Sequence, residues 1–144
     1  MPKKKVEATA YIGDSYLIDI KAGHFSFHID QPKPVGIDTA PTPLEYFLAS
    51  LGGCMCTIGK TIAQQRKLEV KKINVRVVGE IDTDFLLGKV NEGRAGFTNI
   101  KMYIEIDAPI SLEEKKELAT EIEKRCPLSD NVSEKSNIEV IIEN

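Results

Sequence analysis

Residues 42–59 read TPLEYFLASLGGCMCTIG, and this stretch decides the fold. It opens with Thr42, Pro43 and Glu45 in the pattern of a helix-capping box, with proline at the first helical position. The 14 residues from position 46 to position 59 carry no charge. Apolar residues occur all round the helical wheel, which is typical of a helix buried on every side. The stretch therefore predicts a long buried central helix.

This helix must be buried in protein, because its uncharged run is too short for a membrane span. A transmembrane helix takes roughly 18 or more apolar residues. A domain of 144 residues struggles to surround such a helix by itself, and a second copy of the chain could supply the missing cover. We expect an intertwined homodimer.

The flanking sequence alternates between strand and helix patterns. Three short runs rich in β-branched and aromatic residues, at 6–12, 16–20 and 25–29, predict a meander. A proline-rich segment at 31–41 should cross the surface in an extended form before the helix begins. After the helix, alternating runs at 71–81 and 97–106 predict two half-buried strands joined by a loop.

The last third of the chain begins with a second capping box. Ser111 and Glu114 open an amphipathic helix that runs to about Lys124. A short turn or helix should follow to about Ser133, and residues 138–142 predict a final strand. The predicted architecture is a single α+β domain spanning 1–144, in the order β-β-β-α-β-β-α-β.

Composition and charge exclude several classes of partner. The formal net charge is -3 with 28% charged residues, which argues against nucleic acid and against an anionic membrane surface. No apolar stretch follows the lysine cluster at residues 3–5, so the sequence predicts neither a secretory signal nor a membrane anchor. We expect a cytoplasmic protein.

The three cysteines are too few for a disulfide-stapled scaffold, so each is a core residue, a metal ligand or a redox catalyst. Two residues along a helix is a rotation of about 200°, so Cys54 and Cys56 point away from each other. We therefore expect no metal site and no cofactor, and we interpret Cys56 as a core residue. Gly52 and Gly53 each cost the helix about 1 kcal/mol relative to alanine, which indicates close approach of a packed backbone or of a ligand.

Three motifs together resemble the OsmC/Ohr family, named for osmotically inducible protein C and the organic hydroperoxide resistance proteins. They are Thr-Pro-Leu-Glu at 42–45, Ala-Ser-Leu-Gly-Gly-Cys at 49–54 and Arg-Cys-Pro-Leu-Ser-Asp at 125–130. The last two are more similar to a less characterised OsmC-like branch than to the two named peroxidases. The resemblance implies a swapped homodimer with two active sites at its interface, a peroxidatic cysteine at Cys54 and a resolving cysteine at Cys126.

The chain departs from the family pattern at two further positions. The peroxidases use an arginine from the N-terminal strands or loop, whereas the first arginine here is Arg66. They also use a glutamate early in the buried helix, at the position of Leu44, whereas Glu45 lies one residue later. Capping of the helix explains Glu45. A catalytic role for Glu45 stays open, directed at Cys54 of its own subunit or of the other subunit.

A cation near Cys54 is needed, because burial raises a thiol's pKa and the helix N-terminus is too distant to lower it. Lys21, Lys33 and Arg94 are the candidates. Arg94 ranks first, since a guanidinium stays charged when partly buried and can orient a carboxylate.

These observations predict a thiol-dependent peroxidase with an antioxidant role in the stress response. The thiolate of Cys54 would attack a small organic hydroperoxide, Cys126 would resolve the sulfenic acid, and an external dithiol would reset the enzyme. The alternative is a dimer of the same fold that binds a small ligand or senses thiol redox state.

Overall fold

Two units make up the chain in the computed structural model, which describes residues 1–144. The first is Met1–Phe47 and the second is Leu48–Asn144. The prediction that one domain spans the whole chain stays a prediction.

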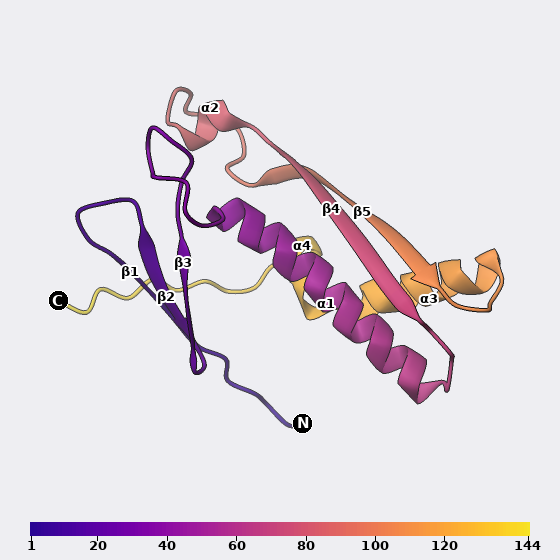
Figure 1. Ribbon diagram of the computed structural model, residues 1–144. Coiled ribbons are helices and arrows are strands. Elements are labelled where there is room, and N and C mark those ends of the chain that lie inside the picture. The colour runs from indigo at the N-terminus through magenta and orange to yellow at the C-terminus, as the bar shows by residue number, and fades with distance from the viewer. The chain divides into compact units, whose positions relative to one another are not determined.

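The first unit contains a three-stranded antiparallel sheet (Figure 1). Its strands are β1 (Ala8–Ile12), β2 (Ile18–Ala22) and β3 (Phe25–Ile29), in that order across the sheet. The predicted meander is therefore confirmed, with the middle strand two residues later than expected. Gly23 makes the turn between β2 and β3 with a φ of 62°, a left-handed conformation that favours glycine.

Strand register gathers apolar side chains on one face of this sheet. Ala10 pairs with Ile20, and Ile20 pairs with Phe27, so the three side chains lie in one row on one face. The rows on either side are also apolar: Ala8, Ala22 and Phe25 on one side, and Ile12, Ile18 and Ile29 on the other. Only Ile20 is buried, while the side chain of Phe25 is 63% exposed. The residues of β1 on this face are exposed as well, and the remaining four, Ile18, Ala22, Phe27 and Ile29, are half-buried.

A buried carboxylate organises the loop after β3. Asp30 accepts hydrogen bonds from the N–H of Gln31 (2.8 Å), the N–H of Thr39 (3.0 Å) and the hydroxyl of Thr39 (2.9 Å). A Cβ atom at Gly36 would lie 2.3 Å from the Asp30 carboxylate, so no larger residue fits there. The extended crossing predicted for 31–41 is therefore wrong. The segment is a tight loop, because its backbone donors turn inward to the carboxylate.

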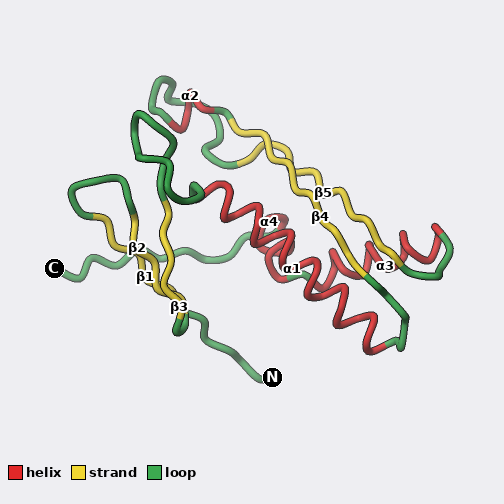
Figure 2. Tube along the Cα trace, in the orientation of Figure 1, coloured by secondary structure: helices red, strands yellow, loops and turns green.

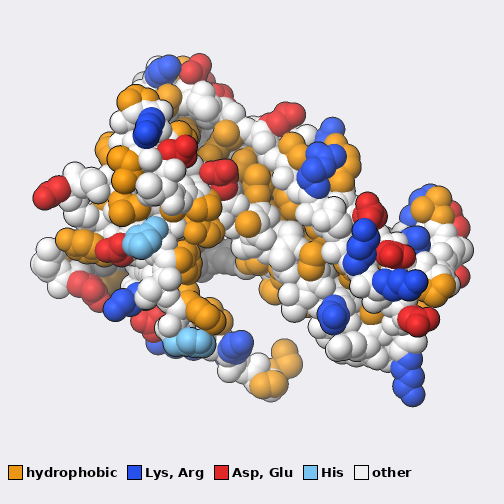
Figure 3. Space-filling model, viewed as in Figure 1, with side chains coloured by type: hydrophobic (Ala, Val, Ile, Leu, Met, Phe, Trp, Pro, Cys, Tyr) orange, Lys and Arg blue, Asp and Glu red, His pale blue; other side chains and the backbone are white.

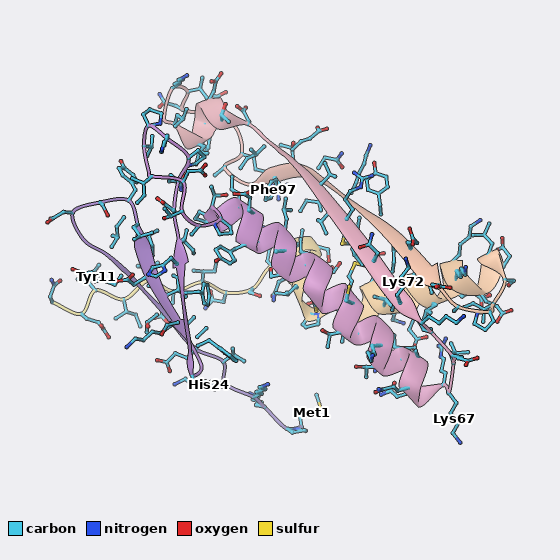
Figure 4. The ribbon with its side chains drawn as sticks, in the orientation of Figure 1. Met1, Tyr11, His24, Lys67, Lys72 and Phe97 are labelled. Atoms are coloured by element: carbon cyan, nitrogen blue, oxygen red, sulfur yellow. The ribbon has the colours of Figure 1, made fainter.

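Helix α1 (Pro43–Gln65) begins at the predicted capping box. The N–H of Glu45 donates to Thr42 Oγ1 (3.2 Å), and the N–H of Thr42 donates to Glu45 Oε1 (3.0 Å). The helix is followed by Lys67, whose φ of 56° reverses the chain toward β4 (Figure 4). The N–H of Leu68 donates to the carbonyl of Ala63 at 2.8 Å, so both ends of α1 are defined by local hydrogen bonding.

The second unit packs one side of α1 against a two-stranded sheet of β4 (Lys72–Ile81) and β5 (Phe97–Asp107). A Cβ at Gly52 would meet Val77 at 3.3 Å, and one at Gly59 would meet Ile73 at 2.6 Å, so both glycines permit close approach of the helix to β4. Gly53 and Thr57, by contrast, are exposed. The predicted burial on every side is therefore not met within one protomer.

Both predicted strands of this sheet are confirmed, and they pair antiparallel along their length. Burial alternates along β4, as expected for a sheet with one face against the core and one exposed. The loop between the strands contains a one-turn helix that the sequence did not predict, α2 (Thr83–Leu86). Asp82 caps α2 by accepting the N–H of Asp84 at 2.9 Å.

Two helices complete the second unit: α3 (Leu112–Arg125) and α4 (Pro127–Ser133). Ser111 caps α3 by accepting the N–H of Glu114 at 3.1 Å, as predicted. The core cluster of the unit consists of Met55, Ile62, Ile106, Leu118, Ile122 and Cys126. It therefore joins α1, β5 and α3 with the residue that starts α4.

The predicted final strand at 138–142 is wrong, since the chain after α4 has no regular structure (Figure 2). The apolar residues of this segment have no neighbouring strand to pair with, and Ile138 and Val140 are 85% and 84% exposed. None of the helices has both the length and the apolarity needed to cross a membrane.

Candidate active site

The thiols of Cys54 and Cys126 are neighbours that share a hydrogen bond. Cys54 comes from the middle of α1, and Cys126 links the end of α3 to the start of α4. Both cysteines are free, and Cys54 packs against the core cluster that contains Cys126. Two reduced sulfurs from distant parts of the chain are therefore held side by side.

The start of α4 places hydrogen-bond donors beside both sulfurs. Cys126 is the N-cap of α4, and its Sγ accepts the N–H of Ser129 at 3.4 Å. The N–H of Leu128 donates to the thiol of Cys54. Pro127 occupies the first helical position and has no N–H to satisfy. The short turn or helix predicted to about Ser133 is a helix, and proline directly after the N-cap Cys126 is the sequence signal for its start.

The end of α3, and with it Cys126, is tied to the end of α1. Arg125 donates from Nη1 to Gln65 Oε1 at 3.0 Å. Arg66 forms an ion pair with Glu121, one turn before Arg125. These contacts, together with the buried packing of Ile122 and Leu118, hold Cys126 next to Cys54.

Burial raises the pKa of the Cys54 thiol above its ordinary value, and the hydrogen bond with the Cys126 thiol raises it further. The N–H of Leu128 opposes both effects by stabilising the thiolate. No lysine, arginine or histidine contributes to the pKa of Cys54. Within one protomer, the neutral thiol of Cys54 is therefore favoured over its thiolate.

Cys56 lies on a different side of α1, as its spacing from Cys54 predicted. Its thiol donates a weak hydrogen bond to the carbonyl of Ile73 at 3.8 Å. It is half-buried and lines a cavity of about 330 Å³ between α1 and the start of β4. Lys72, the first residue of β4, also lines this cavity (Figure 4). Cys56 is therefore separate from the pair of neighbouring thiols.

The other two predicted site residues do not contact this pair within the protomer. Glu45 caps α1, and the hydrogen bonds from the N–H and hydroxyl of Thr42 lower the pKa of its carboxyl. Arg94 lies in the loop before β5 and lines an open cavity of about 780 Å³ with residues of the segment 131–138. No group of three histidine, cysteine or acidic side chains is arranged to hold a metal ion.

Comparison with known proteins identifies the fold and the family. The sequence model of the family described as OsmC-like protein matches residues 36–142. An uncharacterized protein of Methanocaldococcus jannaschii is 30% identical over 103 residues, which cover 71% of this chain and 50% of that protein. This chain thus spans half the length of that relative.

Two matches to Mycoplasma pneumoniae proteins extend over nearly the whole chain. A protein named hydroperoxide reductase is 23% identical over 137 residues, which cover 95% of this chain and 93% of that protein. The crystal structure of an OsmC-like protein has a TM-score of 0.80 at 24% identity, covering 92% of this chain and 89% of that one. The predicted α+β OsmC-like fold and the resemblance to the OsmC/Ohr family are both confirmed. The chain belongs to the OsmC-like protein family.

Proposed function

We propose that this protein is a thiol peroxidase that reduces small organic hydroperoxides. The observation that carries the proposal is the contact between the Cys54 and Cys126 thiols. A peroxide-reducing cysteine needs a second thiol close by, which captures the sulfenic acid before further oxidation. The name of the hydroperoxide reductase relative supports the same chemistry.

The proposed cycle has three steps. The thiolate of Cys54 attacks the terminal peroxide oxygen, the O–O bond breaks, and the alcohol leaves after taking up a proton. Cys126, as a thiolate, attacks the sulfur of the Cys54 sulfenic acid, forming the disulfide and releasing hydroxide, which is protonated to water. An external dithiol then reduces the disulfide and is itself oxidised by two electrons.

Substitution of each cysteine in turn tests this cycle. Turnover of cumene hydroperoxide with dihydrolipoamide should be lost in Cys54→Ser, because no attacking thiolate remains. Cys126→Ser should consume peroxide without forming an intramolecular disulfide, and Cys56→Ser is the matched control that should keep turnover. Full turnover in Cys54→Ser would refute the proposal.

We also propose that the active unit is an intertwined homodimer. The β1 residues and Phe25 on the apolar face of the β1–β3 sheet are exposed, as are Gly53 and Thr57 on one side of α1, and apolar side chains are visible at the surface (Figure 3). The extended apolar segment 138–142 has no strand partner in its own protomer. A second copy would cover these surfaces. A compact species of only 16.0 kDa in analytical ultracentrifugation at micromolar concentration would contradict the dimer.

The proposal assigns supporting roles to Arg94 and Glu45. Arg94 would supply the positive charge that Cys54 lacks within its own protomer, and Glu45 would orient a cation while it caps α1. Both roles depend on the second copy, since neither residue contributes to the pKa of Cys54 in the single chain. Three free cysteines suit a reducing compartment, so we place the enzyme in the cytoplasm.

One observation favours a second candidate function, a ligand-binding or thiol redox-sensing dimer. The raised pKa of Cys54 lowers the thiolate fraction at neutral pH, which suits a slow sensor better than a fast catalyst. The two functions differ in turnover. A sensor loses thiols stoichiometrically when cumene hydroperoxide is added, whereas a peroxidase consumes many equivalents when a dithiol is present.

A further inference from the structure

A cavity on a different side of α1 from the thiol pair contains the third cysteine, Cys56. Its volume is about 330 Å³, and it is lined by the second half of α1, the turn after that helix and the start of β4. Part of its wall is apolar and consists of Ala63, Leu68, Val70 and Ile73. A volume of this size lies at the lower end of the range for small-molecule sites. The cavity can therefore enclose part of a small organic molecule.

Three lysines give this cavity a positive charge. Lys60 comes from α1, and Lys71 and Lys72 come from the point where β4 begins. No aspartate or glutamate lines the cavity. Lys72 forms an exposed ion pair with Glu105 at 3.5 Å, whereas Lys60 and Lys71 form none. A cavity lined by charge of one sign concentrates ligands of the opposite sign, so this one favours anions although the whole chain has a net charge of -3.

The thiol of Cys56 lies in the wall of this cavity and not in the core. Cys56 is half-buried, and it belongs neither to the core cluster of the second unit nor to the residues packed against that cluster. The interpretation of Cys56 as a core residue is therefore wrong. The hydrogen bond that it donates to the carbonyl of Ile73 is long, at 3.8 Å, and does little to hold the sulfur away from a ligand. A nucleophilic group and three cations thus share one small cavity.

We propose that this cavity binds small anionic disulfides and that Cys56 exchanges with them, forming a mixed disulfide with a thiol that carries carboxylates. The apolar wall accommodates the body of the ligand, and the lysines bind its carboxylates. The site is independent of the proposed peroxidase cycle, because it uses neither Cys54 nor Cys126. It is a modification site for small acidic thiols.

The exchange balances without a further reactant. Cys56 loses its proton, and its thiolate attacks one sulfur of the ligand, so that a new S–S bond forms while the S–S bond of the ligand breaks. The electron pair leaves with the other half of the ligand as a thiolate, which takes up a proton. The ligand disulfide is the oxidant, and one of its halves is released reduced. A free small thiol reverses the reaction, so the modified fraction follows the ratio of disulfide to thiol.

Rates of exchange at Cys56 test the selection for anions. In the Cys54→Ala, Cys126→Ala variant, Cys56 is the one remaining thiol. Its reaction with dithiobis-nitrobenzoate, a dianion, is compared with its reaction with dithiodipyridine, which is neutral. Each rate in buffer is divided by the rate in concentrated urea at the same pH and salt, which removes the intrinsic reactivity of the reagent. The normalised rate should be at least about tenfold higher for the dianion.

Substitution of the lysines tests which residues make this selection. Lys60→Gln together with Lys71→Gln should lower the rate with the dianion at least about fivefold and change the rate with dithiodipyridine less than about twofold. Lys101→Gln together with Lys124→Gln is the matched control, because it changes the net charge equally on exposed lysines outside the cavity.

Three outcomes of these rate measurements would overturn the inference. One is a normalised rate that is no higher for the dianion than for the neutral reagent. Another is an equal loss of rate in the two double-lysine variants. The third is a Cys56 thiol that reacts with neither reagent in buffer, since the cavity is then closed to ligands, as it would be beneath a second copy of the chain.

The wild-type protein provides a test that needs no cysteine substitution. Cyanogen bromide cleaves after Met55 and Met102 and so places each of the three cysteines in a different fragment. The protein is treated with glutathione disulfide, its free thiols are blocked with N-ethylmaleimide, and the fragments are identified by mass spectrometry. The glutathionyl group is expected on fragment 56–102. Its absence from that fragment would overturn the inference and leave the proposed function untouched, which depends on Cys54 and Cys126 alone.

Discussion

The thiols of Cys54 and Cys126 share a hydrogen bond, although one comes from the middle of α1 and the other from the start of α4. This contact brings the two predicted redox residues together without a cation beside them. It also leaves Cys126 enclosed and Cys54 the more accessible of the two.

Mild oxidation should produce one intramolecular disulfide, Cys54 to Cys126. The two sulfurs already lie in contact, whereas the thiol of Cys56 is directed to the carbonyl of Ile73. Peptide mapping under non-reducing conditions, after one equivalent of hydroperoxide, measures the products. A dominant Cys56 to Cys126 disulfide would reassign the attacking cysteine.

Arg94→Ala should slow alkylation of Cys54 by iodoacetamide at neutral pH. Burial already raises the pKa of Cys54. In the proposed dimer, Arg94 of the second copy supplies the opposing charge, so its removal raises this pKa further and the thiolate fraction falls about tenfold for each pKa unit. Circular dichroism and ultracentrifugation check that fold and dimer are intact. Lys21→Ala and Lys33→Ala are the comparison variants. No change in any of the three would favour the ligand-binding function over the peroxidase.

Thr42→Ala should lower the free energy of unfolding by about 1 kcal/mol, as typical for the loss of a helix N-cap. The variant removes the acceptor for the N–H of Glu45. Glu45→Gln keeps an oxygen that can accept the N–H of Thr42, so it should retain most of the stability. Urea denaturation measures both variants. Loss of peroxidase activity in Glu45→Gln at unchanged stability would show a catalytic role beyond capping.

Asp30→Asn should be less stable than the wild type at neutral pH, and the difference should shrink on acidification. The N–H of Thr39, then that of Gln31, lower the pKa of the Asp30 carboxyl below its ordinary value. The stabilisation is therefore fully present above the unfolded pKa of about 3.9 and is lost as pH falls through the lower, folded pKa. Asp38→Asn is the matched control, since Asn also tolerates the positive φ of that position. Urea midpoints of the wild type and of Asp30→Asn that differ by the same amount at every pH from 7 to 2.5 would contradict the prediction.

Gly53→Ala should be more stable than Gly52→Ala by about 1 kcal/mol or more. Both variants gain the same helix propensity, but only the methyl at position 52 presses on Val77, at 3.3 Å, while position 53 faces open space. Thermal unfolding of the two variants measures the difference. The reverse order would mean that something outside the protomer packs against Gly53, and a second copy is the expected candidate.

The sequence by itself determined the elements with local causes. Thr42 with Glu45 and Ser111 with Glu114 fix two helix starts through hydrogen bonds within three residues. Alternation along 71–81 and 97–106 predicted β4 and β5, and the spacing of Cys54 and Cys56 predicted that they lie on different sides of α1. Each of these features depends on backbone geometry over a few neighbouring residues.

Only the tertiary structure decided the features that depend on distant partners. The inward turn of the loop after β3 requires hydrogen bonds between the buried Asp30 and Thr39. The segment 138–142 is not a strand, because no other strand of its protomer pairs with it. The motifs at 49–54 and 125–130 pointed to two redox cysteines, but their contact comes from packing α1 against α3 and α4. Local periodicity predicts which face a residue occupies. The residue it meets there is set by long-range packing, which no local pattern encodes.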